Sequence, residues 1–408
     1  MLVRVNVPHW GFREVRGGAA ALIGLAGGAP DALADRIRQE VGHRPFELVA
    51  SARAGLVRAA HALGLKDRRV AVPAYVCPAV SAAMRMAQVE LVAVDCAPGS
   101  FGLEPDGLLA AARAGDIAAV VAPSTYGAPQ DQELLRRSGL PWIEDAAYQG
   151  GQTSPAGHPG GAGLAGHAGV WSFNFKTLTG VGGGVVFLPA VAVADLDPTA
   201  GPWPHGPGRR PRSRAHERAL FANYVLRTIG RHRIPHWLPG GSAPRHLNEH
   251  RARASLDRVP LGSMSELQAA VALAQWGRRE EVARRASENA ERIRAVVADS
   301  PALTDIAPAA RRDSAAPSFP HLYPVLLDPG VPDPERSVWS LRSWLHQAGV
   351  QTEDPYPLVG GQEDGSHNAA ALRRRLLLVP CHASITDGVM RRVAAALTRA
   401  AQRLVSSL

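Results

Sequence analysis

Lysine is the residue type with the clearest chemical meaning in this chain of 408 residues. Of 45 basic residues only two, Lys66 and Lys176, are lysine. Lysine can give up its proton and act as a base or a Schiff-base amine, whereas arginine in a protein cannot. Lys176 follows the apolar segment SFNF, an unfavourable place for an unpaired ammonium. Asp145 ends another apolar segment, WIED, about 30 residues earlier, and a carboxylate held there is suited to a cationic partner.

Further polar residues also come at the ends of apolar segments, namely Tyr75, Cys77, Asp95, Ser124, Tyr126, Ser172 and Asn174. Pyridoxal phosphate (PLP) uses such a set: a lysine for the Schiff base, an acid facing the pyridinium nitrogen, and hydroxyl and backbone N–H donors for the phosphate. Lys176 and Asp145 fit the first two roles. Taken singly, Asp145 could be a helix cap and Lys176 a surface lysine. The pair, followed by the glycine-rich TGVGGG, is far more specific than either residue.

The elements that would position these residues alternate in type between residues 45 and 188. Apolar, β-branched segments at 68–76, 89–95, 117–127, 141–147, 168–175 and 183–188 predict strands. Segments of helical spacing lie between them, at 51–65, 78–88, 103–115 and 131–139. The alternation is typical of βαβ units, so we expect an α/β fold with a mostly parallel wound sheet covered on both faces. Ligands of such sheets bind at the carboxyl ends of the strands, where the polar residues above lie.

The second half of the chain is organised differently. Residues 189–258 contain loop-like stretches rich in Pro, Arg and His and are interpreted as an insertion. Helical spacing resumes at 265–297, and strand-like segments at 321–327 and 376–380 and helical segments at 337–349 and from Asp387 onward follow. We therefore predict a large α/β domain at 1–258, which includes the insertion, and a smaller C-terminal α+β domain at 259–408.

From about Pro45 to its end the chain resembles the DegT/DnrJ/EryC1/StrS sugar aminotransferases, which are PLP enzymes of fold type I. The segments that carry the resemblance are ASARAGL, VPAYVCPAV, VAVDCAP, STYG, WIEDAA, WSFNFKTLTGVGGGVVF, SMSELQAAVALAQ and LLLVPCHASIT. The resemblance implies that PLP forms an internal aldimine with Lys176, which also shuttles protons, and that Asp145 is the partner of the pyridine nitrogen. It also implies that Ser172 binds the phosphate together with the backbone at Ala52 and Arg53.

Some positions depart from the family pattern. Family members place an aromatic residue over the cofactor ring near Cys77, and here the nearest aromatic residue is Tyr75. Tyr148 stands where the family often has Gln or His, and is either a hydrogen-bonding partner of the cofactor or substrate or a partly buried helix residue. The segment from Ser172 to Lys176, which includes the cofactor-binding candidate Asn174, is one residue shorter than in many members. Leu261 stands where the family often has an Asn that reaches the neighbouring subunit's phosphate.

Composition limits the classes of partner. The formal net charge is +9, but the densest basic run, residues 208–214, lies in a Pro- and Gly-rich loop without interleaved aromatic residues, so nucleic-acid binding is not expected. Anionic substrates are compatible, because arginine matches phosphate oxygens in a bidentate manner. The candidate substrate arginines are Arg53, Arg209, Arg210 and Arg212.

Other classes of function lack support in the chain. No segment has the ~20 apolar residues that span a bilayer, so no membrane partner is expected. The three cysteines, Cys77, Cys96 and Cys381, include no CxxC motif, which favours the cytoplasm. No spacing of His, Cys and carboxylates predicts a metal site. His158 and His167, in a Gly-rich loop, either line the site or are solvated.

The resemblance implies an aminotransferase that moves an amino group from glutamate or glutamine to a keto-sugar nucleotide, a keto-cyclitol or a related carbonyl compound. It also implies a homodimer with sites shared across the interface, in which the 189–258 insertion could complete the partner's pocket. Two alternatives remain open: a PLP-dependent elimination or dehydration on the same scaffold, and a catalytically silent PLP-binding protein.

Overall fold

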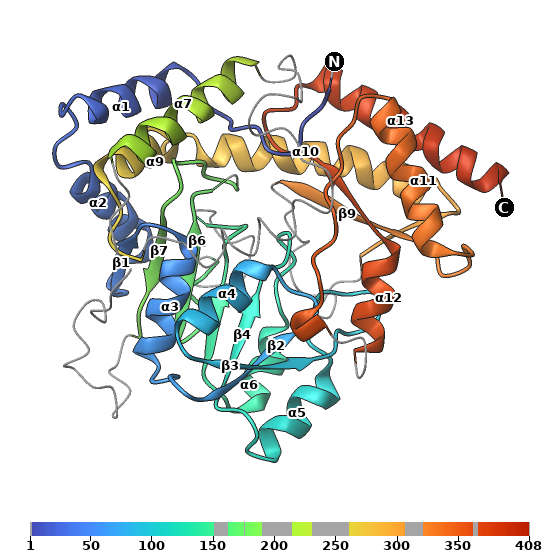
Figure 1. Ribbon diagram of the computed structural model, residues 1–408, viewed down its shortest axis with the longest axis horizontal. Coiled ribbons are helices and arrows are strands. Elements are labelled where there is room, and N and C mark those ends of the chain that lie inside the picture. Colours follow the sequence, from blue (N-terminus) through green and yellow to red (C-terminus); the bar gives the residue numbers. More distant parts are fainter. Residues whose placement is uncertain are drawn as a thin grey trace.

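The computed structural model describes residues 2–150, 162–174, 176–189, 214–230, 261–306, 321–361 and 366–407. A seven-stranded sheet and a separate three-stranded sheet form its two centres, and helices surround both (Figure 1). The α/β class expected from the sequence is confirmed.

The large sheet has the strand order β1-β7-β6-β5-β4-β2-β3. Its strands are β1 (Phe46–Val49), β2 (Arg69–Pro73), β3 (Glu90–Val94), β4 (Ala119–Pro123), β5 (Trp142–Asp145), β6 (Ala168–Ser172) and β7 (Gly184–Phe187). The pairs from β6 through β5, β4 and β2 to β3 are parallel. Among the described strands of this sheet, β7 is the one that runs opposite to the rest, because it pairs antiparallel with both β6 and β1. The expected mostly parallel sheet is therefore confirmed, and β1 is an addition to the strands that the sequence predicted.

Helices cover both faces of this sheet because its central strands are apolar on both faces. Val70 and Val72 of β2 pack in one apolar cluster with α3 (Ala52–Ala62) and α4 (Pro78–Met86). Ala71, between them, packs in another cluster with α5 (Pro105–Arg113) and α6 (Gln132–Ser138). The alternation of side chains along a strand thus assigns each residue to one of the two helical layers.

The C-terminal region contains the small antiparallel sheet, with the order β10-β9-β8. Its strands are β8 (Leu303–Asp305), β9 (Leu322–Leu327) and β10 (Leu376–Pro380). The helices of this region are α10 (Arg279–Ala298), α11 (Pro334–Gln347), α12 (His367–Arg375), α13 (Asp387–Ser406) and the short η1 (Val359–Gly361). The apolar residues of α13 form one buried stripe, as the sequence predicted.

The helical stretch predicted over 265–297 is wrong as one continuous element. It is divided into α9 (Glu266–Trp276) and α10, which begins at Arg279. Gly277 ends α9, and Arg278 has a non-helical ψ of 4°. The two helices have different surroundings: α9 is buried on nearly every side, whereas α10 buries one stripe. A straight helix could not satisfy both environments, so the chain turns between them.

The N-terminal region adds elements that the sequence patterns did not predict. Helices α1 (Phe12–Leu22) and α2 (Ala29–Val41) pack on α9, on the side of the large sheet. The segment before them joins the C-terminal region instead, since the Val3 N–H donates to the Gly349 carbonyl at 2.7 Å. Helix α7 (Arg214–Gly230) lies beside α1 (Figure 1) and is the described part of the 189–258 insertion. The domain boundary at 259 stays a prediction.

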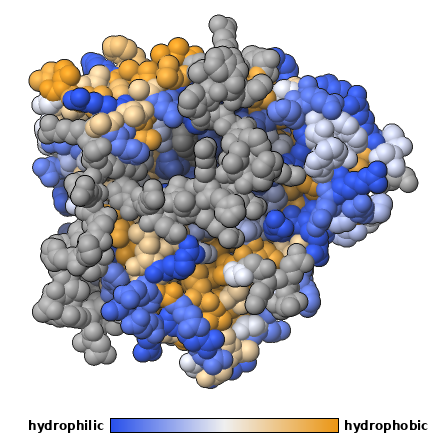
Figure 2. Space-filling model, in the orientation of Figure 1, coloured by the Kyte–Doolittle hydropathy of each residue, from blue (hydrophilic) through white to orange (hydrophobic). Residues whose placement is uncertain are grey.

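The surface over α1 and α7 carries apolar patches among hydrophilic residues (Figure 2, upper left). The large exposed apolar residues there are Phe12, Ile23, Leu25, Leu226 and Ile229. None of the described helices combines the length and apolar character needed to cross a membrane.

Candidate active site

A cavity of about 490 Å³ lies at the carboxyl ends of the strands of the large sheet. Lining residues lie at or shortly after the ends of five strands: Ser51 after β1, Cys77 after β2, Ser124 after β4, Asp145 as the last residue of β5 and Ser172 as the last residue of β6. Adjacent β2 and β4 lead into crossovers on opposite sides of the sheet, and at such a point the strand ends leave a crevice. The fold therefore brings together residues that are more than 100 positions apart in the chain.

Asp145 is a buried acid that lines this cavity. Its side chain is 7% exposed, and its Oδ1 accepts the backbone N–H of Ala147 at 3.1 Å. Burial raises the pKa of Asp145 to about 6, against the opposing effects of the Ala147 N–H and the Lys176 charge. A bound cation would keep this carboxylate ionised, because an opposite charge favours the charged form.

Lys176 lies in the loop between β6 and β7 and lines the same cavity. Burial lowers the pKa of Lys176 to about 8, although Cys77, Glu353 and Asp145 act in the opposite direction. In a fraction of the molecules Lys176 is therefore a neutral amine near neutral pH, and the neutral amine is the nucleophilic form. The structure brings Lys176 and Asp145 into one cavity, as the sequence predicted.

The face of the Tyr148 ring contacts the amine of Lys176. The ring centroid is 3.4 Å from Lys176 Nζ, and the Tyr148 hydroxyl is 2.8 Å from the hydroxyl of Tyr356. Tyr356 also lines the cavity, although it comes from the C-terminal region. Sequence reasoning missed Tyr356, because nothing in its local segment indicates that it meets residues of the large sheet.

Tyr75, the expected aromatic cover of a cofactor ring, is not among the residues that line the cavity. It is fully buried, its hydroxyl is 2.8 Å from that of Tyr126, and it accepts the Tyr356 N–H at 3.0 Å. Cys77 lines the cavity at this position instead. Burial raises the pKa of the Cys77 thiol, so the neutral form is favoured there.

Another part of the cavity wall is the N-terminus of α3. Ala52 and Arg53, the first residues of the helix, line the cavity together with Ser51 and Ser172. The Ser51 Oγ accepts the Ala54 N–H at 3.1 Å, so one N–H of the first turn is capped and the helix presents its positive end to the cavity. Such a terminus, flanked by hydroxyls, is suited to a phosphate.

The glycine-rich turn lets β7 approach this helix terminus. A Cβ on Gly184 would lie 2.4 Å from the Trp171 carbonyl oxygen and 3.1 Å from the Ala52 nitrogen, so no larger residue fits. Gly183 has a φ of +94°, which side chains rarely adopt, and its N–H donates to the Ala50 carbonyl at 3.2 Å. The motif TGVGGG therefore contributes to the shape of the cavity beside the N-terminus of α3.

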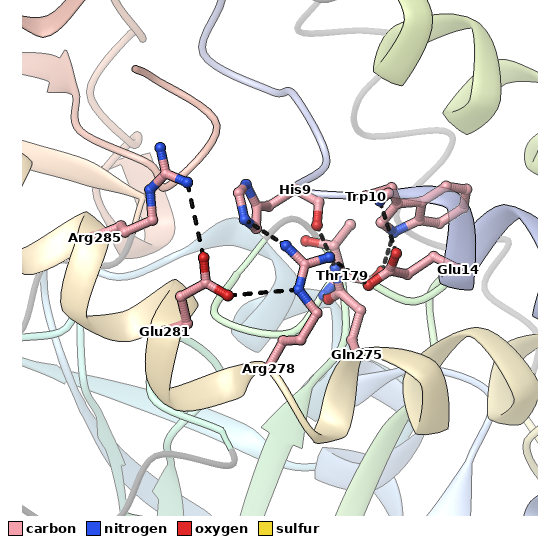
Figure 3. A network of polar contacts seen from close by, with 9 residues as sticks. His9, Trp10, Glu14, Thr179, Gln275, Arg278, Glu281 and Arg285 are labelled. Carbon is pink, nitrogen blue, oxygen red and sulfur yellow. Dashed lines mark hydrogen bonds and ion pairs between the residues drawn. The ribbon is translucent and has the colours of Figure 1, made fainter. Parts of the chain in front are cut away.

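The loop after Lys176 is held in place by the N-terminal segment and α9 (Figure 3). The Trp10 indole donates to the Thr179 carbonyl at 2.5 Å, and the Thr179 N–H donates to Gln275 Oε1 at 2.6 Å. The Gln275 side chain then donates to the His9 carbonyl at 2.9 Å. Because these groups are largely buried, the network limits where the lysine loop can lie.

An ion pair fixes the same network at its outer end (Figure 3). Glu14 is fully buried, accepts the Gly11 N–H at 2.7 Å and pairs with Arg278 at 3.1 Å. Since Arg278 lies at the turn between α9 and α10, this contact ties α1 to that turn.

The remaining wall comes from α7 and the first residues of the chain. His216, Leu220 and Tyr224 of α7 line the cavity together with Asn6. The Tyr224 hydroxyl donates to Asn174 Oδ1 at 2.7 Å, which joins the helix to the lysine loop. Helix α7 thus lines the pocket of its own chain. Its sequence carries no motif that could have identified these residues.

Other candidates lie elsewhere. Arg209, Arg210, Arg212 and His158 fall outside the described residues. His167 contacts Trp142, with ring centroids 4.9 Å apart, and is not a lining residue. Among the residues that the structure describes, no cluster of His, Cys, Asp and Glu could hold a metal ion.

The chain is similar in fold to several solved structures. Spr1654 from Streptococcus pneumoniae, solved in PLP and PMP forms, has a TM-score of 0.74 in the PMP form at 15% identity, over 100% of this chain and 99% of that one. The aminotransferase TlmJ from Streptoalloteichus hindustanus has a TM-score of 0.69 at 20% identity, over 99% and 100% of the two chains. Helicobacter pylori PseC, an aminotransferase involved in the biosynthesis of pseudoaminic acid, has a TM-score of 0.69 at 14% identity, over 99% and 100%. A search of curated proteins finds no match.

A sequence model of one family matches most of the chain, over residues 23–196 and 259–398. The large mostly parallel sheet and the small antiparallel sheet agree with the fold type I architecture of its members. On this evidence the chain belongs to the DegT/DnrJ/EryC1/StrS aminotransferase family.

Proposed function

We propose that the chain is a PLP-dependent aminotransferase that moves an amino group from glutamate or glutamine to the carbonyl of a keto-sugar nucleotide, a keto-cyclitol or a related compound. The observation that carries the proposal is that Lys176, Asp145 and the N-terminus of α3 line one cavity at the strand ends. Family membership supports the reaction class, and the proposed acceptors follow the resemblance to sugar aminotransferases.

The residues present fit the cofactor. The cavity offers an amine at Lys176, an acid at Asp145, and hydroxyl and N–H groups at Ser51, Ser172 and Ala52. Gly184 leaves open the space beside the Ala52 nitrogen that a Cβ would fill. PLP bound here would supply an electron-accepting ring that stabilises negative charge developing at the substrate carbon.

The side chains of the protein would attach the cofactor, transfer the proton and bind the phosphate. Lys176 would hold the cofactor covalently and, once released, take the proton from the Cα of the amino donor through its Nζ. Asp145, ionised beside a ring cation, would keep the pyridine nitrogen protonated. Arg53, in the first turn of α3, lines the same cavity and is a candidate contact for a phosphate group.

The acceptor would contact the wall made by α7 and the N-terminal segment. Asn6, Asn174, His216 and Tyr224 present hydrogen-bonding groups at the cavity, which suits a hydroxyl-rich molecule. We therefore assign specificity for the acceptor to this wall rather than to the strand ends.

The test is the absorption spectrum of the purified protein with PLP. We expect a visible band that borohydride reduction fixes onto the tryptic peptide containing Lys176. The matched control is Lys66→Arg, which removes the only other lysine and should leave the band intact. If wild-type protein with added PLP shows no band, the cofactor assignment is wrong.

Adding glutamate separates the proposed reaction from its alternatives. Conversion of the band to the pyridoxamine form with release of 2-oxoglutarate supports transamination. Loss of a hydroxyl group from the second substrate without amination would indicate elimination or dehydration. A stable band that no amino donor changes would indicate a silent binding protein.

We also propose that two copies associate and that the protein acts in the cytoplasm. The exposed apolar residues of α1 and α7, Phe12 and Leu226 among them, offer a face for a second copy. Light scattering after size-exclusion chromatography tests this: a mass near twice the 43.1 kDa of one chain supports the dimer, and a mass of one chain contradicts it.

A further inference from the structure

We infer that the ring face of Tyr148 is the docking place of the Lys176 ammonium whenever this lysine is not bonded to the cofactor, and that Tyr356 holds the ring there. The catalytic meaning of this contact rests on the proposed function, whereas the contact itself does not.

The first support is the contact between the two residues. Lys176 Nζ lies 3.4 Å from the centroid of the Tyr148 ring, well within the range of a cation–π interaction. Tyr148 is only 5% exposed, so little water competes for the ammonium on this side. Such an interaction is stronger where the cation has lost its hydration.

The second support is the way in which the ring is held. The Tyr148 hydroxyl is hydrogen-bonded to that of Tyr356 at 2.8 Å, and the Tyr148 and Tyr126 rings make an edge-to-face contact with centroids 5.7 Å apart. Thr177, directly after the lysine, donates its hydroxyl to the Tyr148 carbonyl at 3.1 Å. The lysine loop and Tyr148 are therefore joined by two contacts, one from Lys176 Nζ to the Tyr148 ring and one from the Thr177 hydroxyl to the Tyr148 carbonyl.

Tyr356 is itself fixed by residues of both parts of the chain. Its N–H donates to the Tyr75 hydroxyl at 3.0 Å, and its ring stacks on Tyr126 with centroids 5.1 Å apart. Arg373 donates to the Tyr356 carbonyl at 3.1 Å. The position of the docking ring thus depends on contact between the large sheet and the C-terminal region.

The charged and titratable groups around Lys176 explain why a ring is useful. The groups that influence its charge are Cys77, Asp145 and Glu353, and Lys176 in turn acts on His321. A carboxylate or thiolate that held the ammonium could also take its proton. A ring face stabilises the ammonium without accepting the proton, so the lysine can carry a proton taken from the donor Cα and give it up later.

The contact can be measured in the full chain without PLP by NMR of protein labelled with ¹³C-lysine. The chain has two lysines, so the spectrum holds two Hε–Cε signals, and Lys66→Arg assigns them. We expect the Hε protons of Lys176 to lie upfield of those of Lys66, because protons above an aromatic ring are shielded. We also expect Lys176 to titrate with a pKa of about 8.

Two variants of Tyr148 separate the ring from its hydroxyl. Tyr148→Leu should abolish the upfield shift and lower the Lys176 pKa further, because the charged form loses its partner. Tyr148→Phe and Tyr356→Phe each keep the Tyr148 ring but remove the hydrogen bond between the two hydroxyls, so both should reduce the upfield shift without abolishing it. The unchanged Lys66 signal and the circular dichroism spectrum verify that each variant is folded.

The inference is overturned if the Lys176 signal lies at the Lys66 position in the wild type, or if Tyr148→Leu leaves its shift and pKa unchanged. The absorption test with PLP is separate. An upfield Lys176 signal in a protein that forms no PLP band supports the contact and rejects the proposed function. A PLP band in a protein without the upfield shift rejects this inference alone.

Discussion

The backbone N–H of Thr179, three residues after the candidate catalytic lysine, donates to the side chain of Gln275 at 2.6 Å. Gln275 is 1% exposed and comes from α9, nearly 100 residues further along the chain. The lysine loop is therefore positioned by a helix that contributes nothing to the lining of the cavity.

Gln275→Leu should destabilise the protein by about 1–3 kcal/mol, because the Thr179 N–H and the His9 carbonyl lose their buried partner. We also expect a lower rate of amino transfer. Urea denaturation measures the first effect and single-turnover absorbance the second. Gln402→Leu, on the exposed side of α13, is the control and should stay within about 0.5 kcal/mol of the wild type.

Asp145→Asn should affect stability and function in opposite directions. Burial raises the Asp145 pKa from 3.8 to about 6, so the folded chain binds this proton more tightly than the unfolded chain. The stabilisation that the folded chain gains from binding this proton is therefore fully present below pH 3.8 and is lost as the pH rises through about 6. Above that pH the free energy of unfolding is lower by about 3 kcal/mol.

The cofactor-free Asp145→Asn variant should consequently be more stable than wild type at pH near 8 and equal to it at pH near 4. With PLP the variant should lose most activity, because an amide cannot hold a cationic ring nitrogen. Thermal melts at both pH values and initial rates check the two statements. Asp35→Asn controls for the loss of one exposed negative charge. Equal melting temperatures for Asp145→Asn and wild type at pH 8 contradict the expected burial penalty.

Tyr224→Phe removes the hydroxyl that donates to Asn174. A neutral hydrogen bond is worth about 0.5–1.5 kcal/mol, so kcat/KM for the acceptor should fall about 2- to 12-fold. The half-reaction with the amino donor should change little if this wall binds the acceptor. Tyr323→Phe, which removes a hydroxyl bonded to Asp305 away from the cavity, is the matched control. A larger effect on the donor half-reaction than on the acceptor would assign the wall to the donor instead.

Gly184→Ala should weaken PLP binding and destabilise the fold. The new Cβ would meet the Trp171 carbonyl and the Ala52 nitrogen, both backbone atoms that cannot move separately from β6 and α3. Overpacking of this kind costs about 1–3 kcal/mol. Gly388→Ala, in α13 with open space around it, should be neutral or slightly stabilising. Fluorescence titration with PLP and denaturation of both variants give the comparison.

Much of the large sheet was predictable because its signals are local. Val70, Ala71 and Val72 are apolar in succession, as expected of a strand buried on both faces, and the helices between the strands have their own periodicity. The division between α9 and α10 was not predictable in the same way. Both segments have helical spacing, and the turn at Gly277 and Arg278 follows from what each helix packs against.

The sequence by itself determined which reactive groups are present: one of only two lysines among 45 basic residues, an acid at the end of an apolar strand, and a glycine-rich turn that only small residues can form. Its strand periodicity also placed Lys176 and Asp145 at one edge of one sheet. The tertiary structure decided which residues surround the lysine. Tyr356, Tyr224 and Asn6 reach the cavity from remote segments, and Tyr75 is turned away into the core. Those contacts depend on packing between distant elements, and local propensity contains no information about such packing.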